Sequence, residues 1–86
     1  MTYREYKRWA EEYLQQARVL EEKIRNHKNL TYFESAQVRE VNENLIQSMS
    51  DMRRDCLYTY KLLMNKAQEV READQLEKKS KRQRAS

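Results

Sequence analysis

The chain contains neither glycine nor proline among its 86 residues. Turns between paired strands need residues that tolerate positive φ, usually Gly, so β-hairpins are disfavoured. A glycine-rich phosphate-binding loop is excluded as well, because the chain has no Gly. Glu, Gln, Arg, Lys, Leu and Ala, which favour helices, are plentiful instead. The sequence therefore predicts an all-α protein.

Cysteine and histidine occur once each, as Cys56 and His27. One cysteine excludes an intramolecular disulfide, and one histidine without a second thiol or imidazole at ligand spacing argues against a structural zinc site. A domain of this size has a marginal core and commonly relies on disulfides, metals or oligomerisation. Of these three supports, oligomerisation is left. We expect no cofactor and a homodimer.

Long apolar runs are also missing. The first residues lack a basic region followed by an apolar segment, and no stretch approaches the ~18 apolar residues of a membrane span. We therefore expect no membrane contact and a cytoplasmic location.

Catalytic patterns are scarce as well. Two pairs of adjacent acids occur, Glu11 with Glu12 and Glu21 with Glu22. Neighbouring helical residues diverge by about 100°, so neither pair faces a single site. His27 has no acid or thiol three or four residues away and is interpreted as a capping or surface residue, and Cys56 as an inert buried thiol. The sequence predicts a protein that is not an enzyme.

Thr-Tyr-x-Glu occurs twice, at Thr2 to Glu5 and at Thr31 to Glu34. In a capping box, the Thr side chain accepts a hydrogen bond from the N–H three residues on, and the Glu reaches back to the Thr N–H. Each copy therefore predicts the start of a helix.

The first helix is expected over residues 3–26. Its apolar positions alternate in steps of 3 and 4, the heptad spacing of a packed seam: Tyr3, Tyr6, Ala10, Tyr13, Ala17, Leu20 and Ile24. A loop is expected over 27–31, with Asn26 or Asn29 closing the helix in the left-handed conformation.

The second helix is expected over residues 32–77. Its apolar positions drift from a strict heptad: Val38, Val41, Leu45, Met49, Met52, Cys56, Tyr60, Leu63, Ala67 and Val70. They recur every 11 residues, which predicts a nearly straight or slightly right-handed helix. Alternatively, this helix breaks near Asn65 and folds back.

A short loop joins antiparallel neighbours, so an antiparallel helical hairpin with a short first and a long second helix is expected. Folding at residue 29 places Leu20 opposite Val38 and Tyr6 opposite Met52. At 1.5 Å per residue, helix 1 is roughly 36 Å long and reaches only to about Leu57. The apolar residues beyond it then need a partner, and a second copy would complete a four-helix bundle. This self-association surface comprises Tyr58, Tyr60, Leu62, Leu63, Met64, Ala67 and Val70.

Aromatic residues gather at the start of the chain, as Tyr3, Tyr6, Trp9 and Tyr13. Aromatics are common in binding hot spots, so this end is a candidate docking surface for a larger protein. The alternative is that these side chains fill the bundle core or the dimer seam.

The net charge of +4 is confined to the C-terminus. Residues 1–77 carry 13 Lys/Arg against 14 Asp/Glu, whereas 78–86 form a basic tail with five cations, Lys78, Lys79, Lys81, Arg82 and Arg84, and no acid. These cations are candidate phosphate contacts, although a basic helix end also suits the helix dipole and aids solubility.

Taken together, these patterns predict a small helical interaction or regulatory protein that acts through protein–protein contacts, of a kind that phages and other mobile elements encode. The alternative is a nucleic-acid-associated accessory protein that uses its basic tail.

Overall fold

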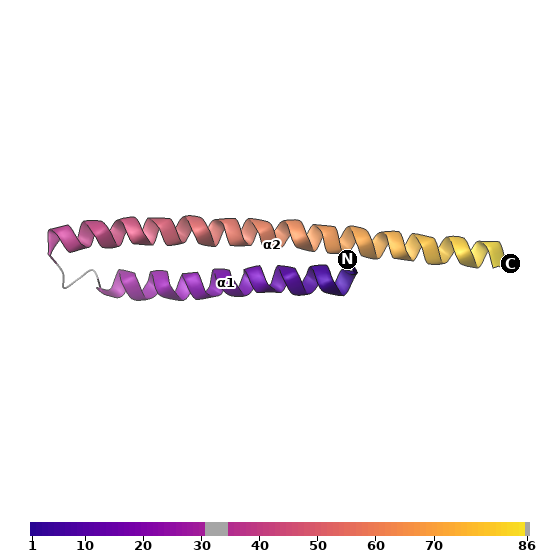
Figure 1. Cartoon of the computed structure of the whole chain (residues 1–86), viewed down its shortest axis with the longest axis horizontal. Coiled ribbons are helices and arrows are strands. Elements are labelled where there is room, and N and C mark those ends of the chain that lie inside the picture. The colour runs from indigo at the N-terminus through magenta and orange to yellow at the C-terminus, as the bar shows by residue number, and fades with distance from the viewer. Residues whose placement is uncertain (31–34, 86) are drawn as a thin grey trace.

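The structure is a computed structural model of the chain, and it describes residues 1–30 and 35–85. It contains two helices, α1 (Tyr3–Leu30) and α2 (Ala36–Ala85), and no strand within those ranges. The helices lie side by side and run in opposite directions, which makes a rod of 76 × 15 × 14 Å (Figure 1). The predicted all-α class is confirmed, with a short first and a long second helix.

Both helices begin at a side-chain cap. The Glu5 N–H donates to Thr2 Oγ1 at 3.2 Å, as the first capping box predicts. The second predicted box, Thr31 to Glu34, lies outside the described residues. The first described turn of α2 is capped by Ser35, whose Oγ accepts a hydrogen bond from the Val38 N–H at 3.4 Å.

The helix ends differ from the sequence prediction. α1 continues past Asn26 to Leu30, and no residue in the described part of the chain has positive φ. Neither Asn26 nor Asn29 therefore adopts the left-handed conformation. α2 begins at Ala36 and continues without a break through Asn65 to Ala85. No Pro or Gly interrupts either helix, so each runs further toward the C-terminus than its apolar pattern indicated.

The packed face of α1 agrees with the prediction. Ala10, Ala17 and Ile24 are buried, and Tyr3, Tyr6, Tyr13 and Leu20 between them are half-buried. All seven positions of the predicted seam therefore face α2.

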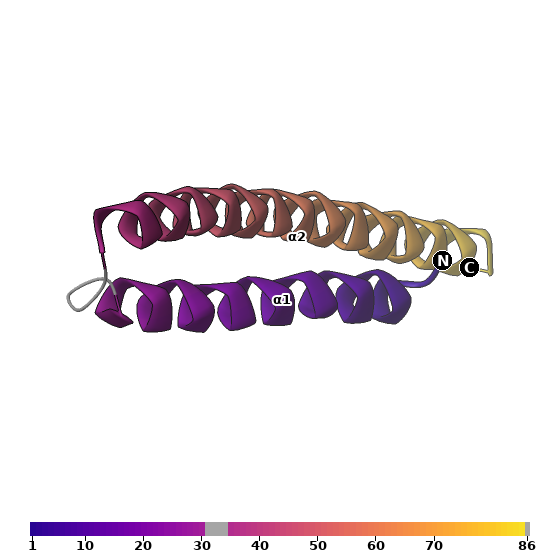
Figure 2. The ribbon, with the colours of Figure 1, turned by 60° about the vertical axis from the view of Figure 1, so that its left-hand side comes forward.

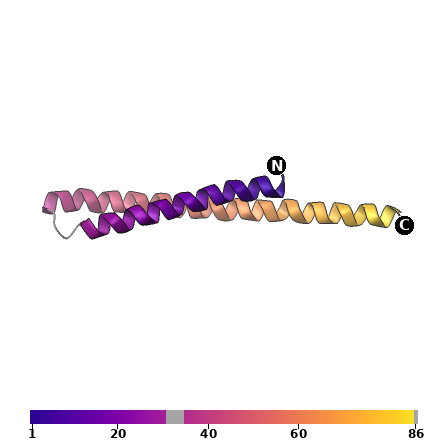
Figure 3. The same cartoon turned by 90° about the horizontal axis from the view of Figure 1, so that it is seen from below.

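The packed face of α2 agrees with the prediction at six of its ten positions, Met49, Cys56, Tyr60, Leu63, Ala67 and Val70, and differs at the other four. Nine of its less exposed residues alternate in steps of 4 and 3: Asn42, Ile46, Met49, Arg53, Cys56, Tyr60, Leu63, Ala67 and Val70. The other half-buried residues flank this line: Ser50, Asp51, Leu57, Thr59 and Met64. The line is a strict heptad, the spacing typical of a left-handed coiled coil, so the 11-residue period was wrong for this face. Val38, Val41, Leu45 and Met52, which were predicted to face α1, are exposed. Asn42 and Arg53 lie in the seam in their place. The helices cross at a shallow angle (Figure 3).

The register of the hairpin is shifted as well. Gln16 was expected near residue 42, but its Oε1 lies 3.7 Å from the Cys56 Sγ. The guanidinium of Arg71 lies 5.4 Å from the centre of the Tyr3 ring. α1 is thus displaced along α2 by roughly two heptads relative to the prediction. α2 extends beyond α1 at both ends (Figures 1 and 3). Figure 2 shows the two helices side by side from another direction.

This shift removes the reason for the predicted self-association surface. α1 covers α2 as far as Arg71 rather than Leu57, so most of the predicted surface packs inside the hairpin. Ala67 has 0% of its surface exposed, and Tyr60, Leu63, Met64 and Val70 are half-buried. Only Tyr58 and Leu62 of that set are exposed, at 64% and 50%.

Candidate interaction surfaces

The N-terminal aromatic residues divide into two groups. Tyr3, Tyr6 and Tyr13 are half-buried in the seam, and the Tyr3 ring contacts Arg71. A cation over an aromatic face is attracted by the ring quadrupole, so this contact fastens the start of α1 to α2. Trp9 lies outside the seam, with 41% of its surface exposed. The docking of a larger protein at this end stays a prediction. Trp9 is the most accessible of the four aromatic residues proposed for it.

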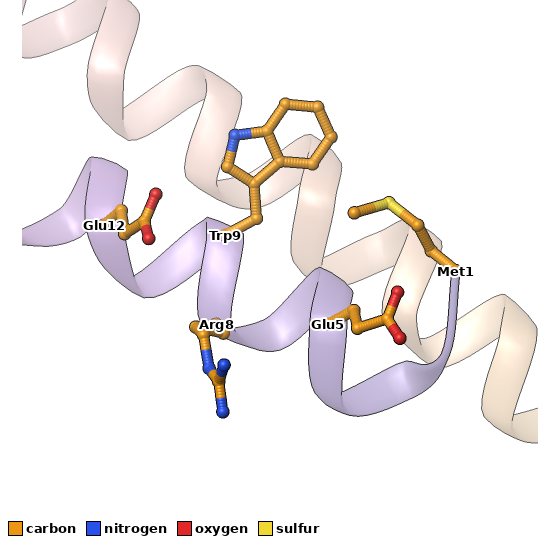
Figure 4. Close-up of a pocket in the computed structure, with 5 residues that line it drawn as sticks. All are labelled: Met1, Glu5, Arg8, Trp9 and Glu12. Atoms are coloured by element: carbon orange, nitrogen blue, oxygen red, sulfur yellow. The ribbon is translucent and has the colours of Figure 1, made fainter.

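Trp9 borders a shallow depression on α1. The depression is lined by Met1, Glu5, Arg8, Trp9 and Glu12. Figure 4 shows the indole and the Met1 side chain on the same side of the helix, while Arg8 points away from them. The accessible floor of this depression is therefore an apolar patch with two carboxylates beside it.

A second depression joins the two helices. It is lined by Gln15, Gln16, Val19 and Leu20 of α1 and by Met52 of α2, and its walls are almost entirely apolar. Gln16 follows Trp9 by seven residues, so the two depressions lie on the same side of α1. Val19 is exposed there beside the exposed Met52 of α2.

Met52 belongs to a stripe on α2. In the first half of this helix, exposed large apolar residues recur at steps of 3, 4 and 7: Val38, Val41, Leu45 and Met52. Together with Trp9 and Val19 of α1 they form what we call the apolar side of the hairpin. Sequence reasoning had identified all four of these α2 residues as apolar seam positions but had placed them against α1.

The opposite side carries a basic groove made of two adjoining depressions. One is lined by Glu21, Ile24, Arg25, Lys28, Ser50 and Arg53, and the other by Ser50, Arg53, Arg54, Leu57, Tyr58 and Lys61. Ser50 and Arg53 are common to both depressions, so the groove is continuous across the two helices. We call these residues the basic groove.

Sequence reasoning missed the basic groove because it counted charge along the chain. Residues 1–77 are nearly neutral in sum. Around the helix axes, however, five cations converge on one side. The signal that could have found part of the groove was the spacing of Arg54 and Lys61, which are seven residues apart and share one face of a helix.

The predicted tail residues are part of α2. Lys78 and Lys79 are exposed, and Lys81, Arg82 and Arg84 lie in the helix backbone, with side chains outside the described part of the structure. The five tail cations therefore extend a helix that projects past the start of α1 (Figure 1).

The remaining candidate groups have local partners. The His27 Nδ1 lies 2.8 Å from the Lys23 carbonyl oxygen, one turn earlier in α1. Cys56 is half-buried in the seam beside Gln16. No group of three or more His, Cys, Asp or Glu side chains that could hold a metal occurs within the described residues. Neither described helix has an apolar segment long enough to cross a membrane.

Comparison of the chain with protein-family models, with curated proteins and with solved structures finds no match.

Proposed function

We propose that the protein is a non-enzymatic helical interaction module that self-associates through its apolar side. The observation that carries this proposal is the mismatch between a sparse core and a rich exposed apolar surface. Among the side chains that the structure describes, no large one is fully buried, and the buried apolar residues are Ala10, Ala17, Ile24, Met49 and Ala67.

The core of one hairpin is too small to stabilise it well. Three of its five buried apolar residues are alanines, which gain little from burial. Chains of this size with so little core commonly gain their stability by oligomerisation. The apolar side has the side chains that the core lacks, and each large one contributes up to about 1.5–3 kcal/mol when fully buried.

A second copy is the occupant that this shortage favours. A second copy of the chain is present whenever the chain is synthesised, so it is available to stabilise every newly made hairpin. Self-association through the apolar side joins two hairpins into a four-helix arrangement. In it, one face of α2 packs against α1 of the same chain and the neighbouring face of α2 packs against the second copy.

The proposal is tested by the solution mass of matched variants. Size-exclusion chromatography with light scattering should give the wild-type chain twice its 10.6 kDa mass. Val41→Lys with Leu45→Lys places two cations on the apolar side, and we expect this variant to elute as a monomer at the same concentration. The melting temperature of the wild type should rise with protein concentration, because association stabilises the folded state.

The control is Gln47→Lys with Gln75→Lys, which adds the same charge to the same helix away from the apolar side. This variant should stay a dimer. A wild-type chain that is monomeric, folded and unaffected in melting temperature by concentration contradicts the proposal. A monomer that binds a different protein through Val41 and Leu45 would show that the apolar side has another occupant.

A further inference from the structure

We infer that the basic groove binds the phosphate backbone of a single-stranded nucleic acid. The inference concerns the opposite side from the apolar side and does not depend on self-association. It differs from the predicted use of the tail, because it places the main contacts in the body of the hairpin.

The groove concentrates positive charge. Arg25, Lys28, Arg53, Arg54 and Lys61 line it, and Glu21 is the acid among its lining residues. Arg54 also forms an exposed ion pair with Asp51 at 3.3 Å, which offsets part of this charge, and three-quarters of the Arg54 side chain stays accessible. Converging cations on an elongated surface are the electrostatic pattern of phosphate-backbone binding.

An aromatic side chain lies among these cations. Tyr58 lines the same depression as Arg53, Arg54 and Lys61, and its side chain is exposed. Bases of a single strand stack on exposed aromatic rings while cations contact the phosphates, a combination that duplexes cannot use because their bases are paired and stacked. The exposed Tyr58 ring beside the cations therefore favours a single strand over a duplex as the ligand.

The groove stays accessible when the apolar side is covered. Arg54 follows Leu45 by nine residues and Lys61 follows Met52 by nine, which is half a turn at about 100° per residue. A second copy on the apolar side therefore leaves the groove open.

The inference is tested with a fluorescently labelled oligothymidylate and the full-length chain, by anisotropy at several salt concentrations. Arg54→Gln with Lys61→Gln should weaken binding at least tenfold at low salt. It should also reduce the slope of log K against log salt by about 1.4, the value for two lost single-strand phosphate contacts. Tyr58→Ala should weaken binding with little change in that slope, since stacking carries no charge.

The matched control is Arg8→Gln with Lys23→Gln, which removes the same charge from α1 outside the groove and should leave binding nearly unchanged. A full-length variant with all five tail cations replaced by Gln should keep most of the affinity. Circular dichroism establishes that each variant is folded.

Four outcomes overturn the inference. They are the absence of salt-sensitive binding by the wild type, equal losses in the groove and control variants, loss of binding only in the tail variant, and equal affinity for an acidic polypeptide such as polyglutamate.

Discussion

Asn42 is a polar residue in the packed face of α2, with 9% of its surface exposed. Its Nδ2 donates to the His27 carbonyl oxygen at 3.3 Å. That carbonyl is among the last four of α1, which have no partner within the helix. In a chain without Gly to close α1, a side chain from the other helix satisfies this group. Asn42 therefore both caps α1 and fixes its position along α2.

We expect Asn42→Ala to lower the free energy of unfolding by about 0.5–1.5 kcal/mol, the net value of one hydrogen bond. Asn44→Ala is the matched control, because Asn44 is exposed on the same helix. Urea unfolding followed by circular dichroism measures both. Equal effects of the two substitutions would contradict the capping role.

Alanines set the distance between the helices. Ala10 and Ala67 have 0% exposure, although neither side chain is large. Burial this complete at such small residues means that the helix backbones approach closely there.

Ala67→Leu inserts a larger side chain into this tight contact. We expect it to destabilise the hairpin by about 1–3 kcal/mol, since overpacking forces strained side chains or a shifted backbone. Ala73→Leu, at an exposed position further along α2, should change stability by less than about 0.5 kcal/mol. Thermal unfolding compares them, and an Ala67→Leu variant as stable as wild type would show that the helices are not closely packed there.

At the scale of the helices, the packed face of α1 was predictable throughout and that of α2 only in part. All seven seam positions of α1 are apolar, so the apolar pattern and the packed face coincide. In α2, Asn42 and Arg53 occupy seam positions, while Val38, Val41 and Leu45 lie outside the seam. A pattern built on apolar residues alone therefore follows the apolar side near the start of α2 and the seam toward the end of α2. This mixture created the apparent 11-residue drift.

The candidate surfaces depended on the register of the hairpin. The predicted register followed from folding the chain at residue 29, whereas α1 continues to Leu30 and α2 begins at Ala36. The predicted exposed residues followed from that register. The helical fold could be derived from composition and capping, whereas the two interaction sides required the packing.

The start of α2 depends on Ser35. We expect Ser35→Ala to reduce stability by about 0.5–2 kcal/mol, because the Val38 N–H loses its acceptor. Ser48→Ala, at an exposed position inside α2, should be neutral or stabilising, because Ala favours a helix interior. Chemical denaturation separates the two. A loss of stability for Ser48→Ala as large as that for Ser35→Ala would mean that the cap contributes nothing.

At the scale of the whole molecule, the hairpin is a thin rod with two unlike sides. One side exposes large apolar residues from both helices, and the opposite side gathers cations around Tyr58. A rod 14–15 Å thick has little interior, so both the self-association and the nucleic-acid binding that we propose are assigned to its surface. Covering the apolar side adds the missing core and leaves the basic groove open.

The most direct test of this account is sedimentation equilibrium of the full-length chain over a range of concentrations, at low and at high salt. The account predicts a dimer whose association is unchanged or strengthened by salt, because the contact is apolar rather than ionic. A chain that sediments as a folded monomer at every concentration would contradict it.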